Sequence, residues 1–187
     1  MATKLGQFRD YDEHDVINLF TLNEDAIGTD GGVTNGHFVK ISTASGWMNT
    51  DELQMIGAAG QDYNNTESQR YGVNAKVVLA DANDPVLGMM LYDCKETDEN
   101  GEKLLYNPRK AAEMGVTISG QSCPIVTKGI FSYSGSVLAT DQVAGTGQAL
   151  YVDANGELTT TDGGGTKVGQ CLGSKDTNGH FLIRIDL

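Results

Sequence analysis

Several short motifs carry residue types that could do chemistry. A serine nucleophile on an α/β scaffold is expected within G-x-S-x-G, and neither residues 120–124 (GQSCP) nor residues 132–136 (SYSGS) match that spacing. Residues 163–167 read GGGTK, but the phosphate-loop pattern G-x-x-x-x-G-K-[ST] is absent and no predicted helix follows. The sequence therefore predicts neither serine hydrolysis nor nucleotide binding at these positions.

Two acidic turns place oxygen atoms beside a glycine, as a calcium loop does. These are residues 98–102 (DENGE) and 153–157 (DANGE). Neither keeps the alternating D-x-[DN]-x-[DN]-G pattern with a later glutamate, so we interpret both as solvated turns. Carboxylate pairs for glycoside cleavage depend on a tertiary separation of about 5 to 9 Å, so the 25 acidic residues single out no pair.

The pentapeptide Thr-Asn-Gly-His-Phe occurs at residues 34–38 and again at 177–181. It indicates either an internal duplication or two uses of a preferred Asn-Gly turn, and the sequence leaves both open. His37 and His180 invite a metal interpretation. A histidine beside a turn glycine is more often solvated or bonded to the backbone, which we favour.

Three cysteines, Cys94, Cys123 and Cys171, show no C-x-x-C spacing and no neighbouring histidine cluster. We interpret them as buried free thiols of a chain folded in a reducing cytosol. Cys123 lacks a nearby base that would make it a nucleophile. We expect no catalytic residue, no metal site and no cofactor.

The charge balance restricts the partners. The chain has 187 residues, with 13 Lys+Arg against 25 Asp+Glu and a net charge of −12. Phosphate binding needs a basic stripe, which is absent, so we expect no direct nucleic-acid partner. The polar N-terminus does not resemble a signal peptide, and the apolar run 85–91 is far shorter than a membrane span. We expect a soluble, unexported protein with no membrane partner.

The C-terminal stretch predicts a β-meander. Residues 149–152 and 158–161 are β-rich and flank an Asn-Gly turn, and 168–172 gives a third strand. In the last run, apolar Phe181, Ile183 and Ile185 alternate with Leu182, Arg184 and Asp186, the period of a half-buried strand.

Earlier elements are read by the same rules. Strands are predicted at 38–42, 77–79, 86–93, 116–119 and 123–133. Residues 14–22 favour a strand, with a helix as the competing interpretation. Asn107 and Pro108 predict the start of a short helix that ends at Gly115.

These elements predict a mainly β fold, a small β-barrel or β-sandwich meander with one short helix and an extended N-terminal arm. The arm spans residues 1–13, and residues 14–187 form a single β-rich domain. That domain carries an insertion around 46–72, which we interpret as a long exposed loop, and a hairpin around 94–106.

The order of "ALYVD", "GELTTT", a glycine-rich break, "KVGQCLG" and a closing apolar strand resembles the capsid decoration (cement) proteins of tailed bacteriophages. The resemblance reaches upstream to the turn 32–36 and the strand 38–41. It implies a non-enzymatic virion protein that binds the outer surface of the capsid, stabilises contacts between major capsid subunits and is assembled in the host cytoplasm. The implied partners are the major capsid protein and further copies of this chain, as a trimer or a dimer.

Candidate capsid contacts come from segments without an evident core to join. The arm carries Leu5, Phe8 and Tyr11, and the loops 28–36 and 60–72 carry Thr34, Asn35 and Tyr63. Apolar side chains of an unpaired arm would gain burial only by ordering on a partner.

An alternative of another class is a tail-fibre or tail-associated β-module that binds host carbohydrate. Sugar platforms need exposed Trp or Tyr faces, and Trp47 is the only tryptophan. An uncharacterised hydrolase is a third, weaker alternative.

Overall fold

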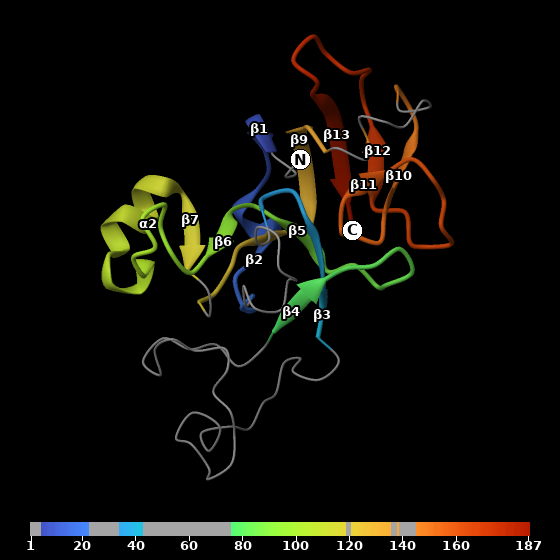
Figure 1. Cartoon of the computed structure of the whole chain (residues 1–187). Coiled ribbons are helices and arrows are strands. Elements are labelled where there is room, and N and C mark those ends of the chain that lie inside the picture. Colours follow the sequence, from blue (N-terminus) through green and yellow to red (C-terminus); the bar gives the residue numbers. More distant parts are fainter. Residues whose placement is uncertain (1–4, 23–33, 43–75, 119–120, 136–137, 139–144) are drawn as a thin grey trace.

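Two antiparallel sheets make up most of the computed structural model, which describes residues 5–22, 34–42, 76–118, 121–135, 138 and 145–187 (Figure 1). The mainly β fold predicted from the sequence is confirmed. Within the described residues neither sheet closes into a barrel, so the sandwich-like alternative describes the architecture.

The larger sheet has six antiparallel strands in the order β1-β9-β13-β12-β10-β11. Four of them are the strands predicted for the C-terminal stretch, which are confirmed, but they do not form a simple meander, because β12 pairs with β10 and not with β11. The strands are β1 (Leu5–Asp10), β9 (Lys128–Tyr133), β10 (Ala149–Val152), β11 (Leu158–Thr159), β12 (Gly169–Cys171) and β13 (Phe181–Asp186).

Strand β13 shows why the sheet has one buried and one exposed face. Phe181, Ile183 and Ile185 are buried, whereas the residues between them face solvent. This is the predicted alternation, and it fixes the register, because a slip by one residue would turn the apolar set outward.

The second sheet has the order β2-β8-β5-β3-β4. Its strands are β2 (Val16–Ile17), β3 (Phe38–Ile41), β4 (Val77–Leu79), β5 (Gly88–Met90) and β8 (Ile125–Val126). Adjacent residues of one strand, such as Met89 and Met90, join different apolar clusters. This sheet is therefore buried on both faces, which explains its uninterrupted apolar runs.

The segment 14–22 contains less regular structure than either sequence interpretation. A single 3-10 turn, η1 (Glu13–Asp15), leads into the two-residue strand β2, and Thr21 makes isolated bridges to Lys76 and Ser122.

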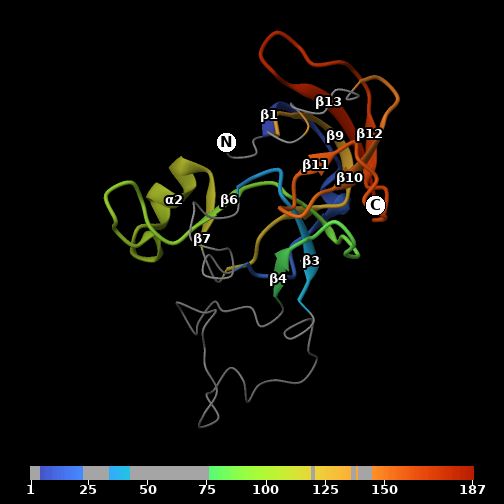
Figure 2. The same ribbon diagram turned by 45° about the vertical axis from the view of Figure 1, so that its right-hand side comes forward.

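A small module stands to one side of both sheets (Figures 1 and 2). It comprises β6 (Asp93–Lys95), the hairpin closed by the Thr97–Lys103 bridge, η3 (Leu104–Tyr106), α2 (Pro108–Met114) and β7 (Val116–Ile118), with β6 and β7 parallel. The helix is the predicted one. The Asn107 side chain accepts a hydrogen bond from the Lys110 amide, and Gly115 ends the helix at φ 63°.

The main core lies between the two sheets around Tyr133, which is completely buried. Its hydroxyl oxygen accepts the Leu158 amide at 3.2 Å, which satisfies a backbone donor of β11 at the end of the sheet. Burial raises the pKa of Tyr133 far above its ordinary value, so it stays protonated.

The N-terminal arm is extended, as predicted, but it does not lack a core to join. Residues 5–10 form β1, which pairs with β9, and Leu5 is only 7% exposed within the main core. The Arg9 guanidinium also donates to the Leu91 carbonyl at 3.2 Å. The expectation of a segment waiting for a partner is wrong for these residues, because the edge of β9 supplies the hydrogen bonds and the core supplies the apolar contact.

The insertion 46–72 lies outside the described residues. The single β-rich domain from residue 14 stays a prediction.

Replacing the buried phenol tests the core. Tyr133→Phe leaves the Leu158 N–H without its acceptor, and we expect the free energy of unfolding to fall by about 1 to 3 kcal/mol. Urea unfolding measures it, with Tyr151→Phe on the half-exposed face as the control. Equal stability of Tyr133→Phe and the native chain would contradict this account of the core.

The acid stability of the module rests on Asp98. Its carboxylate bonds the Lys110 ammonium and accepts the Asn100 and Glu102 amides at 2.8 Å, and the Lys110 hydrogen bond is the main cause of its lowered pKa. Because the pKa of Asp98 is lower in the folded protein than in the unfolded chain, its ionised carboxylate stabilises the folded state at pH values above the unfolded pKa of about 4. This stabilisation is lost as the pH falls through the folded pKa.

We therefore expect the Tm of the native protein to fall between about pH 5 and pH 2. In Asp98→Asn the Tm should be lower at neutral pH and less sensitive to acid. Thermal unfolding followed by circular dichroism checks this, and identical acid profiles for the two proteins would refute it.

Candidate functional site

A groove runs along β1, the end strand of the larger sheet. No other described strand pairs with the outer edge of β1. The groove has a volume of about 760 Å³ and is open to solvent, and it is lined by Leu5, Gly6, Gln7, Phe8, Arg9, Ser132, Asp176, Asn178 and His180.

Close approach of three segments forms the groove. A Cβ at Gly6 would lie 2.6 Å from Ser132 Oγ and 3.2 Å from His180 Cδ2. Only glycine therefore allows β1, β9 and the turn before β13 to come together without displacement.

The turn at 176–180 is held by its own carboxylate. Asp176 Oδ1 accepts the amides of Asn178 and His180, both at 2.8 Å, and Gly179 has φ 86°. The His180 amide is the largest cause of the lowered pKa of Asp176. These bonds hold His180 and Asn178 at one end of the groove.

The two acidic turns considered as calcium loops, residues 98–102 and 153–157, are held by the same kind of hydrogen bond from backbone amides to an aspartate carboxylate. Asp153 Oδ1 accepts the amides of Asn155 and Glu157 at 2.9 Å, as Asp98 does in the module. Their carboxylates stabilise backbone turns. Across the described ranges, no group of three His, Cys, Asp or Glu side chains is placed to hold a metal ion.

The structure brings two of the predicted contact residues together, but inside the protein. The Leu5 amide donates to Asn35 Oδ1 at 2.6 Å, and the Asn35 amide and Nδ2 donate to Asp93 Oδ1 at 2.8 and 2.9 Å. Asn35 thus links β1 to the start of β6, and the reason for treating Leu5 as an unburied contact no longer holds.

Phe8 is the most exposed of the predicted contacts that the structure describes, at 53%. Tyr11 is 37% exposed and stacks on Phe131, with ring centroids 5.8 Å apart. The Thr34 hydroxyl lies 3.0 Å from His37 Nδ1. Tyr63 lies outside the described residues. The geometry leaves Phe8 as the apolar side chain that the groove presents.

Sequence reasoning missed Ser132, Asp176 and Asn178, and it treated His180 as a solvated or backbone-bonded turn residue, with a metal ligand as the alternative. These residues join the groove because β1 pairs with β9, a contact across more than a hundred residues with no local signal.

The thiols are buried and free, as predicted. Burial raises the pKa of Cys123 to about 12, and its sulfur donates to the Phe20 carbonyl at 3.2 Å. A thiol of this kind is a poor nucleophile. As for membranes, none of the described helices has the length and apolar character to cross one.

Fold and groove together define a β-rich protein in which the outer edge of β1 is unpaired among the described residues. Residues 105–187, somewhat less than half of the chain, match the family model of the phage cement protein. The match confirms the resemblance to capsid decoration proteins and supports a structural, capsid-stabilising role. Neither a curated protein nor a solved structure matches the chain.

Two substitutions on β1 distinguish a side chain that stabilises the fold from one that lies on the surface. Leu5→Ala should lower the free energy of unfolding by about 2 to 5 kcal/mol, because it opens a cavity in the main core. Phe8→Ala should change it by less than about 0.5 kcal/mol, because the side chain is half exposed. Chemical denaturation measures both, and equal effects would show that β1 is not packed as described.

Proposed function

We propose that this chain is a non-enzymatic virion protein that binds the outer surface of a phage capsid and stabilises contacts between neighbouring major capsid subunits. The observation that carries the proposal is the family match, because residues 105–187 supply β9 to β13, five of the six strands of the larger sheet. Most of the larger sheet therefore lies within the part of the chain that matches the phage cement proteins, together with α2, β7 and β8.

The groove along β1 is the proposed capsid contact. An open sheet edge can accept an extended segment as an added strand, with main-chain hydrogen bonds giving affinity and side-chain pockets giving specificity. Phe8, on β1 itself, would anchor the added segment, whereas Ser132 and His180 lie on the β9 side of β1 and would meet only side chains that reach across the groove. No described strand pairs with this edge, and an unpaired edge is otherwise an aggregation hazard, so a partner there also suits the fold.

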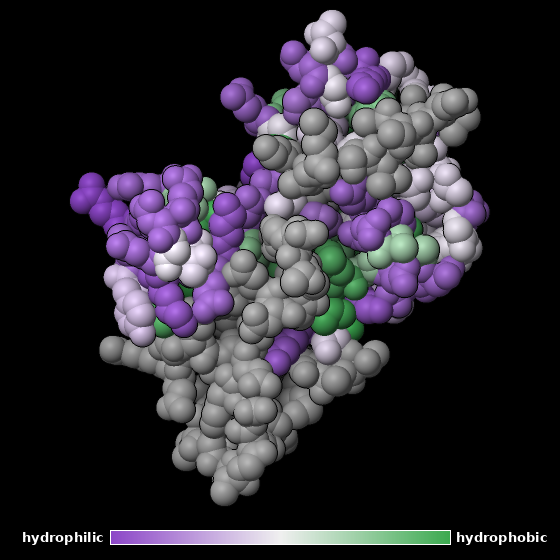
Figure 3. All heavy atoms as spheres, in the orientation of Figure 1, coloured by the Kyte–Doolittle hydropathy of each residue, from purple (hydrophilic) through white to green (hydrophobic). Residues whose placement is uncertain are grey.

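The distribution of charge fits a position on the exterior. Residues 1–104 carry 7 Lys+Arg against 18 Asp+Glu, whereas residues 105–187 carry 6 against 7. Figure 3 shows hydrophilic residues over the module and over much of the described surface in that view. An acidic surface repels nucleic acid and favours solvent, as expected for a protein outside the shell and away from the packaged genome.

The protein would stabilise the capsid by occupying binding sites on it and not by catalysing a reaction. A ligand that binds only the assembled state contributes RT ln(1 + [L]/Kd), about 2.7 kcal/mol per site at a hundredfold excess over Kd. Association of the protein into dimers or trimers would increase this stabilisation, because linked attachment points raise the effective concentration. Trimers are preferred, because a capsid lattice is rich in threefold positions.

A tail-associated carbohydrate-binding module is the second candidate. Tyr106 favours it, because this side chain is 82% exposed on the module and could serve as a sugar platform. The copy number in purified virions separates the two functions. Hundreds of copies per particle support decoration of the head, whereas a handful supports the tail.

The anchoring role of Phe8 has a direct binding test. We expect Phe8→Ser to weaken binding to empty heads at least about tenfold, which corresponds to about 1.4 kcal/mol. Leu19→Ser is the matched control, because Leu19 is also exposed, at 54%, but lies outside the groove. Co-sedimentation with heads gives both affinities, and a wild-type affinity for Phe8→Ser would remove the groove from the proposal.

Bridging itself is tested on whole particles. Heads decorated with the protein should retain their DNA at a temperature, or in an EDTA concentration, at which stripped heads release it. The protection should rise with occupancy. If stripped and decorated heads lose DNA equally, the protein does not stabilise the shell.

A further inference from the structure

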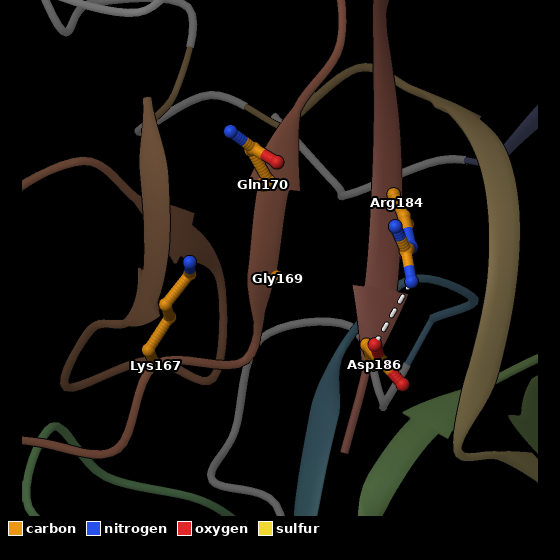
Figure 4. A pocket seen from close by; sticks show the side chains of 5 residues that line it. All are labelled: Lys167, Gly169, Gln170, Arg184 and Asp186. Carbon is orange, nitrogen blue, oxygen red and sulfur yellow. Dashed lines mark hydrogen bonds and ion pairs between the residues drawn. The ribbon is translucent and has the colours of Figure 1, made fainter. Parts of the chain in front are cut away.

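A second hollow lies on the exposed face of the larger sheet, over β12 and β13. It has a volume of about 240 Å³ and is lined by Lys167, Gly169, Gln170, Arg184 and Asp186. Figure 4 shows Lys167 on one side and Arg184 on the other, with Gly169, which has no side chain, between them. The hollow lies at the Asp186 end of β13, whereas the groove lies at the His180 end, and the two share no lining residue.

Backbone packing makes this hollow a fixed feature. A Cβ at Gly169 would lie 2.2 Å from the Arg184 carbonyl oxygen, so glycine at this position allows β12 and β13 to pack closely beneath the hollow. The register pairs Gln170 with Arg184, which places their side chains on the same face.

The hollow is cationic in a strongly acidic protein. Arg184 Nη2 and Lys128 Nζ share one carboxylate, Asp186, at 3.0 and 3.5 Å. Lys167 is exposed and makes no ion pair with a described residue. The lining therefore carries two cations, Lys167 and Arg184, and one acid, Asp186, which also pairs with Lys128 from β9, in a chain whose net charge is −12. Such a site favours a carboxylate-bearing partner.

A matching acidic element exists on the same chain, at the tip of the module hairpin. Glu99 and Glu102 are exposed there and form no salt bridge with a described residue. The tip has a defined shape, because Asp98 holds it through the amides of Asn100 and Glu102 and through Lys110. Figures 1 and 2 both place the module and β12 on opposite sides of the molecule.

We propose that the hairpin tip of one copy docks into the hollow of a second copy, with the Glu99 and Glu102 carboxylates between Lys167 and Arg184. The two surfaces differ and lie on opposite sides, so the contact is head-to-tail; it repeats from copy to copy and closes into a ring where the rotation between copies brings the last copy back to the first. The groove along β1 stays open for the capsid. This inference rests on the proposed function only for its setting, because it assigns the contact between copies.

The partner is this chain and not an unrelated acidic protein, because both charged surfaces are present here in complementary form. Exposed ion pairs each contribute little energy, but they select partner and register. The association should therefore weaken as salt rises, since charges at the rim of an interface are screened.

Charge reversal tests the contact in solution with the full chain. Analytical ultracentrifugation would compare the native chain with a reversed tip (Glu99→Lys with Glu102→Lys) and a reversed hollow (Lys167→Glu with Arg184→Glu). It would also include a chain that carries all four changes. Arg109→Glu with Lys175→Glu is the control, because it reverses two exposed cations outside both surfaces.

We expect the native chain and the control to associate, each reversed variant to raise the dissociation constant at least tenfold, and the fourfold variant to recover association. Circular dichroism establishes that each variant is folded. A monomeric native chain, a reversed variant that associates with the native dissociation constant, or a fourfold variant that does not recover would overturn the proposal. No heads are present, so such a failure leaves capsid binding to be judged by the Phe8 assay.

Discussion

The burial of Tyr133 is the constraint on which the rest of the structure depends. Its ring fits between the sheets only because two neighbours are glycines: a Cβ at Gly135 would lie 2.4 Å from its Cε1, and one at Gly36 3.1 Å from its Cε2. Leu5 pairs with it across β1 and β9, and its hydroxyl accepts the Leu158 amide at the other end of the sheet. One side chain thus fixes β1, the turn before β3 and β11 relative to one another.

This rigidity gives the proposed function its physical basis. A protein that stabilises a shell by bridging must present its contact surfaces without reordering, since ordering on binding subtracts from affinity. The groove meets this requirement, because β1 is held by β9, by Arg9 and by the bond from Leu5 to Asn35. The hairpin tip also keeps a fixed conformation, because the Asp98 carboxylate accepts the amides of Asn100 and Glu102. Surfaces prepared in this way can combine many weak contacts over a lattice.

The sequence predicted correctly those features of the fold that depend on residues close together in the chain. The alternation of β13, the caps of α2 at Asn107 and Gly115, and the Asn-Gly turns follow from residues within a few positions of each other. The pairing of β1 with β9 could not be read this way, because a polar strand with a single core residue, Leu5, looks like an unpaired arm. The groove was missed for the same reason: Ser132 and His180 meet Gly6 only through that pairing.

The most direct test of the central claim is a cryo-electron microscopy reconstruction of virions that contain the protein. The account predicts density for the β-sheets at regular positions on the outer surface of the head. The free edge of β1 should face a segment of the major capsid protein, and the density should bridge neighbouring subunits. Density confined to the tail, or a head surface contacted only through other faces of the protein while β1 points to solvent, would contradict it.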